Sequence, residues 1–269
     1  MLAIDDGISS RPVNAIYLYC IVKASKRPSM ARVPEGLPGA TRPELLQLSR
    51  SLRLVVGEVP LDTYGSGQLE AHLADLEWVG RIAVAHEAVV ENFARRPGLT
   101  VVPMKLFTMF STRDRALAEI GDKQLEIAAI VRRISGAQEW GLRVTQRTGA
   151  ARRATSARRA GTGAEFLAGK KSARDAATHA KAAAAESAVA AYRRLSKLAK
   201  ESRVRDDAPA SAATPPLLDA AFLVPAAKRA RFTQAAKREA ATCAKAGAQV
   251  TLSGPWPAYN FVDSGAQRS

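Results

Sequence analysis

The residues able to carry acid–base, nucleophilic or metal chemistry are few and stand far apart in this sequence. Its 269 residues include three histidines, His72, His86 and His179, and two cysteines, Cys20 and Cys243. None of the five has another Cys or His at the spacing that metal ligands require. The G-x-S-x-G turn that exposes a nucleophilic serine is absent as well. We therefore predict no metal site, no catalytic residue and two free thiols.

Residues 163–171 (GAEFLAGKK) approach a phosphate-binding motif without matching it. A P-loop has four residues between its glycines, then Lys and a Ser or Thr, and it follows a buried strand. Here five residues separate Gly163 from Gly169, and Lys171 stands where the magnesium-binding hydroxyl would be. The segment also follows a polar stretch. We predict no nucleotide or other cofactor, and no enzyme activity.

His86 stands on the apolar face of a predicted helix at 68–95, among residues spaced three or four apart. Two roles are open for it, a tuned acid or base and a packed, hydrogen-bonded core residue. We predict the packed role, because a lone histidine on an apolar face has no partner for catalysis. The residues of this face are Leu76, Val79, Ala83, His86, Val90 and Phe93.

The second half carries nearly all of the formal net charge of +15. Residues 1–136 contain 17 Lys and Arg against 15 Asp and Glu, and residues 137–269 contain 23 against 10. A basic, alanine-rich half is typical of a solvated helix surface, and also of a surface that contacts phosphates. Few aromatics and no nucleic-acid motif accompany it. Nucleic-acid binding is the alternative function, and steep salt dependence would be its signature.

The apolar patterns predict an α+β protein with two domains, at 1–136 and 137–269. The order of elements in the first domain suits an open sheet with helices on one face. Its expected elements are strands at 15–22, 52–59 and 99–110, the helix 68–95, and a helix capped by Ser111 or Thr112 that runs to about Ile134. Those of the second are strands at 140–145, 217–224 and 248–253, an Ala-rich helical region at 163–205 that is straight, kinked or a hairpin, and a helix at 226–246. Polar stretches at 146–162 and 206–216 predict a surface loop and a linker.

The longest apolar run, residues 15–22, is much shorter than the roughly 20 residues that span a bilayer. The first residues also lack the basic start of a secretory signal. We expect a cytoplasmic protein without a membrane segment.

Two segments are candidate partner-binding sites. Pro103 interrupts the strand 99–110, and a proline that cannot donate to a ladder predicts an open sheet edge. Near the end of the chain, Trp256, Tyr259 and Phe261 form an aromatic cluster, stiffened by Pro257, that should not remain in water. We expect this tail either to fold back and cover the core of the second domain or to bind a hydrophobic partner directly.

Six segments in order along the chain resemble the gas vesicle protein GvpF/GvpL family. They are 17–19 (YLY), 84–89 (VAHEAV), 101–108 (VVPMKLFT), 140–144 (WGLRV), 163–167 (GAEFL) with 170–171 (KK), and 254–261 (GPWPAYNF). The basic, alanine-rich second half departs from the family's pattern, and so do Lys170 and Lys171, where Arg is usual.

The resemblance implies an N-terminal modified ferredoxin-like domain and a second α+β domain with long helices. It also implies a bacterial structural or assembly protein without enzyme activity. Such a protein would help to build gas vesicles by binding the small hydrophobic shell protein and other accessory proteins. A physical reason supports that role, because a shell subunit that will face gas exposes apolar surface before assembly and aggregates unless it is covered.

Overall fold

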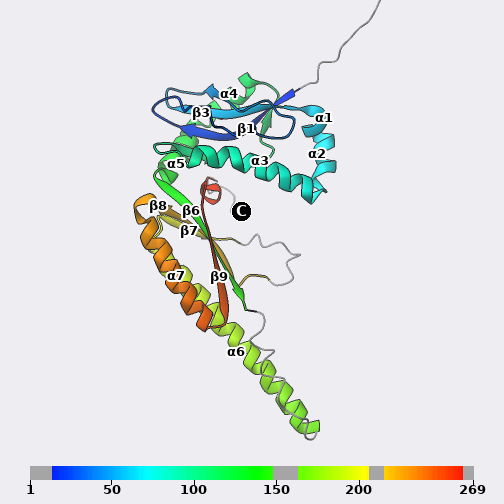
Figure 1. Cartoon of the computed structure of the whole chain (residues 1–269), viewed down its shortest axis with the longest axis vertical. Coiled ribbons are helices and arrows are strands. Elements are labelled where there is room, and N and C mark those ends of the chain that lie inside the picture. The colour runs from blue at the N-terminus through cyan, green and yellow to red at the C-terminus, as the bar shows by residue number, and fades with distance from the viewer. Residues whose placement is uncertain (1–13, 148–162, 206–214, 263–269) are drawn as a thin grey trace, which may run out of the picture. The chain divides into compact units, whose positions relative to one another are not determined.

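The computed structural model of the chain describes residues 14–147, 163–205 and 215–262 (Figure 1). The chain forms two compact units, one containing the residues up to Ser135 and those from Pro257 onward, the other Gly136–Trp256. Each unit holds one antiparallel sheet with helices, which confirms the predicted α+β class. The predicted loop and linker at 146–162 and 206–216 lie almost wholly outside the described residues.

The sheet of the first unit is built around β1, whose sequence NAIYLYCIVK is buried at all positions except its two ends. The strand order is β2-β3-β1-β4, with β5 also paired to β1, and every pairing is antiparallel. This is the order of a ferredoxin-like split βαβ sheet, with a loop at 24–43 where the first helix would be. The strands are β1 Asn14–Lys23, β2 Glu44–Gln47, β3 Leu52–Pro60, β4 Thr100–Pro103 and β5 Met109–Phe110.

Helices cover both faces of this sheet, and the expectation of helices on one face is wrong. Successive β1 residues point to opposite faces, and both sets are buried, so each face needs a cover. Figure 1 shows α3 and α4 on opposite sides of the sheet. The helices are α1 Leu61–Tyr64, α2 Ser66–Leu73, α3 Leu76–Ala94, α4 Arg113–Asp122 and α5 Gln124–Ile134.

The predicted helix 68–95 is divided into α2 and α3 at Asp75. The Asp75 carboxylate accepts hydrogen bonds from the backbone N–H groups of Glu77 and Trp78, and so begins a new helix. Leu76 is therefore the first residue of α3 and is 83% exposed, although periodicity placed it on the buried face. The Thr112 hydroxyl caps α4 as predicted, by accepting from Arg115 N–H, but the helix predicted to run to about Ile134 is divided into α4 and α5 at Lys123.

The second unit has the same strand order as the first, read as β7-β8-β6-β9. Here a helix follows the first strand, so the unit is a complete βαββαβ arrangement. The sequence did not predict β7, because its four residues are polar or charged except for Val204. The elements are β6 Ala137–Gln146, α6 Gly163–Ser196, β7 Glu201–Val204, β8 Leu218–Pro225, a short 3₁₀ turn Ala226–Lys228, α7 Arg229–Lys245 and β9 Ala248–Trp256.

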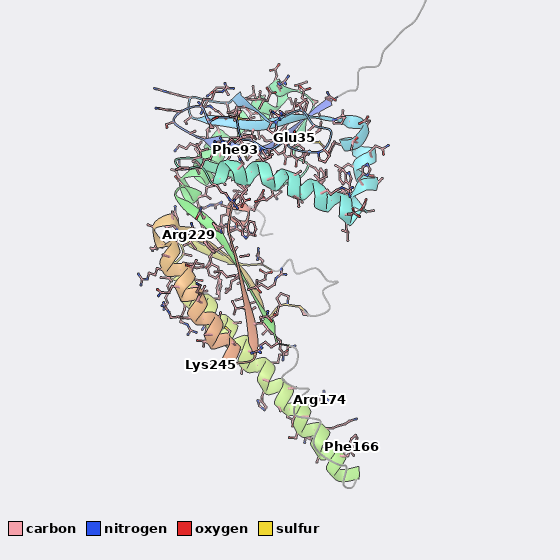
Figure 2. The ribbon with its side chains drawn as sticks, in the orientation of Figure 1. Glu35, Phe93, Phe166, Arg174, Arg229 and Lys245 are labelled. Atoms are coloured by element: carbon pink, nitrogen blue, oxygen red, sulfur yellow. The ribbon has the colours of Figure 1, made fainter. Side chains whose placement is uncertain are left out.

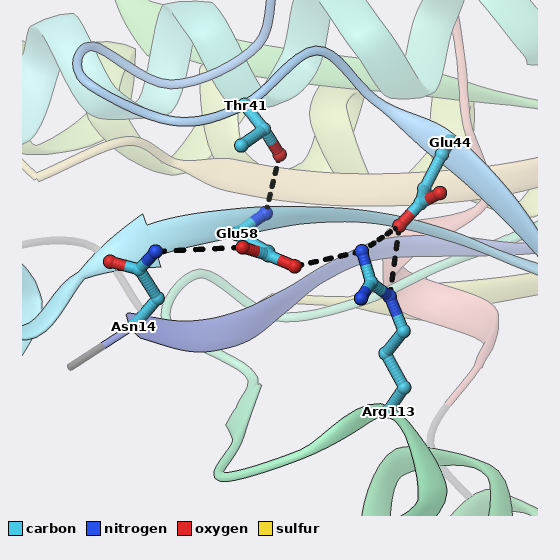
Figure 3. Close-up of polar contacts among 5 residues, drawn as sticks. All are labelled: Asn14, Thr41, Glu44, Glu58 and Arg113. Atoms are coloured by element: carbon cyan, nitrogen blue, oxygen red, sulfur yellow. Dashed lines mark hydrogen bonds and ion pairs between the residues drawn. The ribbon is translucent and has the colours of Figure 1, made fainter. Parts of the chain in front are cut away.

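A polar network connects the start of α4 to the neighbouring strands β2 and β3 of the first sheet (Figure 3). The Arg113 guanidinium lies 2.6 Å from a carboxylate oxygen of Glu44 on β2 and 2.7 Å from one of Glu58 on β3. Glu58 N–H also donates to the Thr41 hydroxyl at 2.9 Å. These side chains are partly exposed, so we expect the ion pairs to orient α4 more than to stabilise the fold.

Gly36 offers a test of the core around β1. Its φ is +93°, and a Cβ built there would lie 2.5 Å from the Tyr19 hydroxyl oxygen, which itself accepts a hydrogen bond from Leu37 N–H. We expect Gly36→Ala to cost about 2–4 kcal/mol, from left-handed strain together with loss of that bond.

Gly98→Ala is the matched control, since Gly98 has φ +78° and no atom within 4 Å of its built Cβ. It carries the backbone strain alone, about 1 kcal/mol. Urea unfolding of both variants measures the difference. Equal losses of unfolding free energy in the two variants would show that the Tyr19 side chain moves away from the added methyl group without cost.

Candidate functional site

A buried hydrogen-bonded group connects β1 with α3 and with the loop that follows β4. The Tyr17 hydroxyl lies 2.8 Å from His86 Nδ1 and also accepts from Phe107 N–H at 3.4 Å. Met104 N–H donates to the Tyr19 carbonyl at 3.1 Å. Tyr17 and Tyr19 alternate along β1 and so point to the same face, where α3 presents His86. One strand thereby positions two segments that lie far away in the sequence.

Burial keeps this group neutral. It raises the pKa of Tyr19 to about 12 and that of Tyr17 further still. It lowers the pKa of His86 to about 4. His86 is 2% exposed and its Nε2 has no hydrogen-bond partner among the described residues. The predicted packed role of His86 is confirmed, and a neutral, buried pair of this kind does not exchange protons near pH 7.

The strand is interrupted at Pro103, as predicted. β4 ends at this buried proline and pairs only with β1, and β5 resumes on the same strand after a loop at 104–108. Within the loop Phe107 has φ 62°, the only positive φ of a residue other than glycine in the described chain. A bulky residue held in this conformation costs of order 1–3 kcal/mol and occurs most often at functional surfaces.

Phe107 ends a stack of three rings on the first unit. Its ring lies 5.8 Å from that of Trp78 at an interplanar angle of 5°, and Trp78 lies 4.7 Å from the His72 ring at 15°. All three side chains are half-buried. Flat aromatic surface that remains partly accessible to solvent is suited to binding an apolar partner.

The tail after β9 belongs to the first unit. The Tyr259 hydroxyl donates to Glu87 Oε2 at 2.6 Å, and the Phe261 carbonyl accepts from the Arg133 guanidinium. Phe261 is fully buried, and Tyr259 packs against the core that contains Tyr17. The expectation that the tail covers the core of the second domain is wrong, because Glu87 and Arg133, which bind its polar groups, both belong to the first unit.

The structure divides the five candidate partner-binding residues by their exposure. Pro103, Pro257 and Phe261 are buried, and Tyr259 is half-buried. Trp256, the last residue of β9, is 43% exposed. Of the five, only Trp256 is classed as exposed.

The sequence analysis did not single out the aromatic stack or the residues that hold the tail. Glu87 and Phe107 did fall within segments that carried the family resemblance, which was the available signal. Trp78 and His72 gave none, because the stack depends on how α2 and α3 meet the loop after β4. The residues missed are His72, Trp78, Glu87, Phe107 and Arg133.

Within residues 14–147, 163–205 and 215–262, no three His, Cys, Asp or Glu side chains lie close enough together to hold a metal ion. Both cysteines are buried and unpaired. None of the helices described combines the length and apolar character that crossing a bilayer requires.

Comparison with known proteins gives one consistent result. A family model described as "Gas vesicle synthesis protein GvpL/GvpF" matches residues 15–263. Gas vesicle protein L of Streptomyces sp. (strain CB03234) is 28% identical over 255 residues, which cover 91% of this chain and 92% of that protein.

Two crystal structures share the fold. Gas vesicle protein GvpF from Anabaena sp. PCC7120 superimposes with a TM-score of 0.67 at 14% identity, over 95% of this chain and 99% of that one. GvpF from Microcystis aeruginosa gives 0.63 at 14% identity, over 93% and 99%. At this identity the likeness concerns the fold alone.

His86 should make stability depend on pH. Unfolded histidine binds a proton near pH 6.5, whereas His86 in the fold resists protonation down to about pH 4. Between these values the unfolded state binds more protons, so the free energy of unfolding should fall as the pH is lowered from 6.5. We expect His86→Asn to have a lower melting temperature at pH 7 and a shallower pH dependence.

Thermal melts at intervals between pH 5 and 7 measure this slope. His179→Asn, at an exposed position on α6, should keep the parent slope. An unchanged slope in His86→Asn would contradict the assignment. Partner binding below the melting temperature should survive the substitution.

Tyr259→Phe removes one hydroxyl and tests how firmly the tail is held. The hydroxyl donates to a carboxylate in a mostly buried setting, and burial together with Glu87 raises the pKa of Tyr259. We expect a loss of about 1–2 kcal/mol in urea unfolding. Tyr192→Phe, which removes a hydroxyl that contacts the neutral Ser202 side chain in the second unit, should cost less. An equal or larger loss there would argue against a special role for the Glu87 contact.

Proposed function

The chain belongs to the GvpL/GvpF family of gas vesicle synthesis proteins, and we propose that it binds the small hydrophobic shell subunit during vesicle assembly. It acts as a structural or assembly protein and not as an enzyme. Its place is the cytoplasm and the growing vesicle, where it also meets other gas vesicle accessory proteins.

The interrupted sheet edge of the first unit is the observation that carries this proposal. Among the described residues no strand pairs with the outer side of β4 or β5, and the half-buried β5 can offer this edge to an added strand. The loop at 104–108 brings the half-buried Leu106 and Phe107 to the same place. Backbone groups next to apolar side chains match a subunit that is apolar and not yet packed.

The candidate residues have distinct roles in this proposal. Pro103 ends β4 and so opens the edge. Pro257, Tyr259 and Phe261 hold the tail against the first unit, and Trp256 offers an exposed indole. Contact energy in such interfaces is concentrated in a few aromatic anchors, of which Phe107 is the most constrained.

Phe107→Gly separates binding from folding. Glycine relieves the strain of φ 62°, which offsets part of the apolar burial lost with the ring. We therefore expect a melting temperature close to the parent value and at least a tenfold loss of affinity for the shell subunit, about 1.4 kcal/mol. A pull-down with purified shell subunit, quantified by titration, measures this.

Leu125→Ala is the control, because Leu125 lies on α5, outside the loop at 104–108, and is the most exposed large apolar side chain described on the first unit. It should bind like the parent. If Phe107→Gly binds the shell subunit as tightly as the parent does, the proposed site is wrong. If the chain instead binds duplex DNA, with an affinity that falls steeply as salt rises, the nucleic-acid alternative would be favoured.

A further inference from the structure

Among the described residues, none outside α6 buries the first half of this helix. Every residue from Phe166 to Ala183 is exposed, whereas Ala184, Ala188, Ala191 and Leu195 are fully buried. Eighteen residues correspond to about 27 Å of helix. Figure 2 shows Phe166 and Arg174 on the part of α6 that extends beyond the Lys245 end of α7. We call residues 166–183 the arm.

The arm continues the face that packs in the second half of α6. Ser187 contacts Cys243 and Arg194 contacts Glu239, so α7 runs antiparallel to α6. The last turn of α7 therefore lies close to the C-terminal end of the arm. At helical spacing the buried face of α6 extends along the arm through Ala180, Ala177 and Ala173 to Phe166. A helix whose small, apolar face is exposed to solvent gains stability when a partner covers that face.

The arm is basic and carries apolar side chains near its start. It contains four Lys and Arg against one Asp, and Phe166 and Leu167 are 54% and 67% exposed. Lys170 lies over the Phe166 ring at 4.9 Å. The Lys171 and Arg174 side chains form no ion pair with any described residue. The arm therefore combines exposed apolar surface with uncompensated positive charge.

A surface of opposite character lies on the first unit, where α2 meets α3. Residues 61–81 contain four Asp and Glu against one basic residue, Arg81, which pairs with Glu77 at 2.8 Å, although the chain as a whole is strongly basic. Leu73 and Leu76 are exposed there, between the exposed Glu70 and Glu77. We call Glu70, Leu73, Leu76 and Glu77 the acceptor.

We propose that the arm of one copy of this chain docks on the acceptor of a second copy. Apolar side chains meet apolar side chains, and lysines meet carboxylates, on two surfaces that neither unit covers by itself. Because the two surfaces differ, the contact is head-to-tail, and such contacts extend into rings or filaments. Two arms would instead bring like charges together, which disfavours arm-to-arm pairing.

The salt dependence of self-association distinguishes this contact from nonspecific association. Copies with a net charge of +15 repel one another, so nonspecific association should increase as salt screens the repulsion. Docking of the arm on the acceptor depends on local attraction and should weaken as salt rises. The sign of the salt effect is therefore informative before any residue is changed.

Sedimentation velocity of the full chain over a range of concentrations, at low and high salt, tests the proposal. We expect the parent to associate, and the arm variant K170E/K171E and the acceptor variant E70K/E77K each to associate at least about tenfold more weakly. Mixing the two variants should restore association, because each then meets the opposite charge on the other. The control K228E/R229E makes the same charge change at exposed positions near the start of α7 and should behave like the parent.

Thermal melts verify that the variants fold, and their binding to the shell subunit should remain, since none of the changed residues lies in the loop at 104–108. A monomeric parent at every concentration would overturn the proposal. So would a mixture of the two variants that stays monomeric, association that strengthens with salt, or equal weakening in the control variant.

Discussion

The burial of two tyrosine hydroxyls on one face of β1 is the constraint on which the first unit depends. A buried hydroxyl needs a hydrogen-bond partner, and β1 brings Tyr17 and Tyr19 to the same side of the sheet. Their partners come from the loop before β2, from α3 and from the loop after β4. Satisfying these hydroxyls thus fixes the position of the loop that holds Phe107, and with it the interrupted edge that we propose binds the shell subunit.

The two units follow one strand order and differ in what joins the first two strands. In the first unit a loop takes this place, and α4 and α5 cover the second face of the sheet. In the second unit α6 takes it, and α6 is longer than the sheet and α7 can cover. The surplus length is the arm. The same topology therefore yields a sheet covered on both faces, with an interrupted edge, in one unit and a projecting basic helix in the other.

The sequence predicted the α+β class, most strands and helices, the cap at Thr112, the break at Pro103 and the family. Each of these depends on residues close together in the sequence. The signals are the spacing of apolar residues, a hydroxyl before a helix, a proline within a strand and short motifs. It failed at β2 and β7, which are short and contain few apolar residues, and at Leu76, where a cap shifted the start of the helix. Periodicity cannot detect a four-residue strand whose pairing depends on a neighbour already in place.

The local sequence by itself indicated that Tyr259 and Phe261 would not remain fully in water, because aromatic rings of that size leave water wherever an apolar surface is available. Only the tertiary structure decided where. Glu87 and Arg133 lie 172 and 128 residues from their partners in the tail, and no pattern along the chain links them. The same holds for the stack of His72, Trp78 and Phe107. Contacts between distant segments depend on how the sheet and helices meet, which local periodicity does not encode.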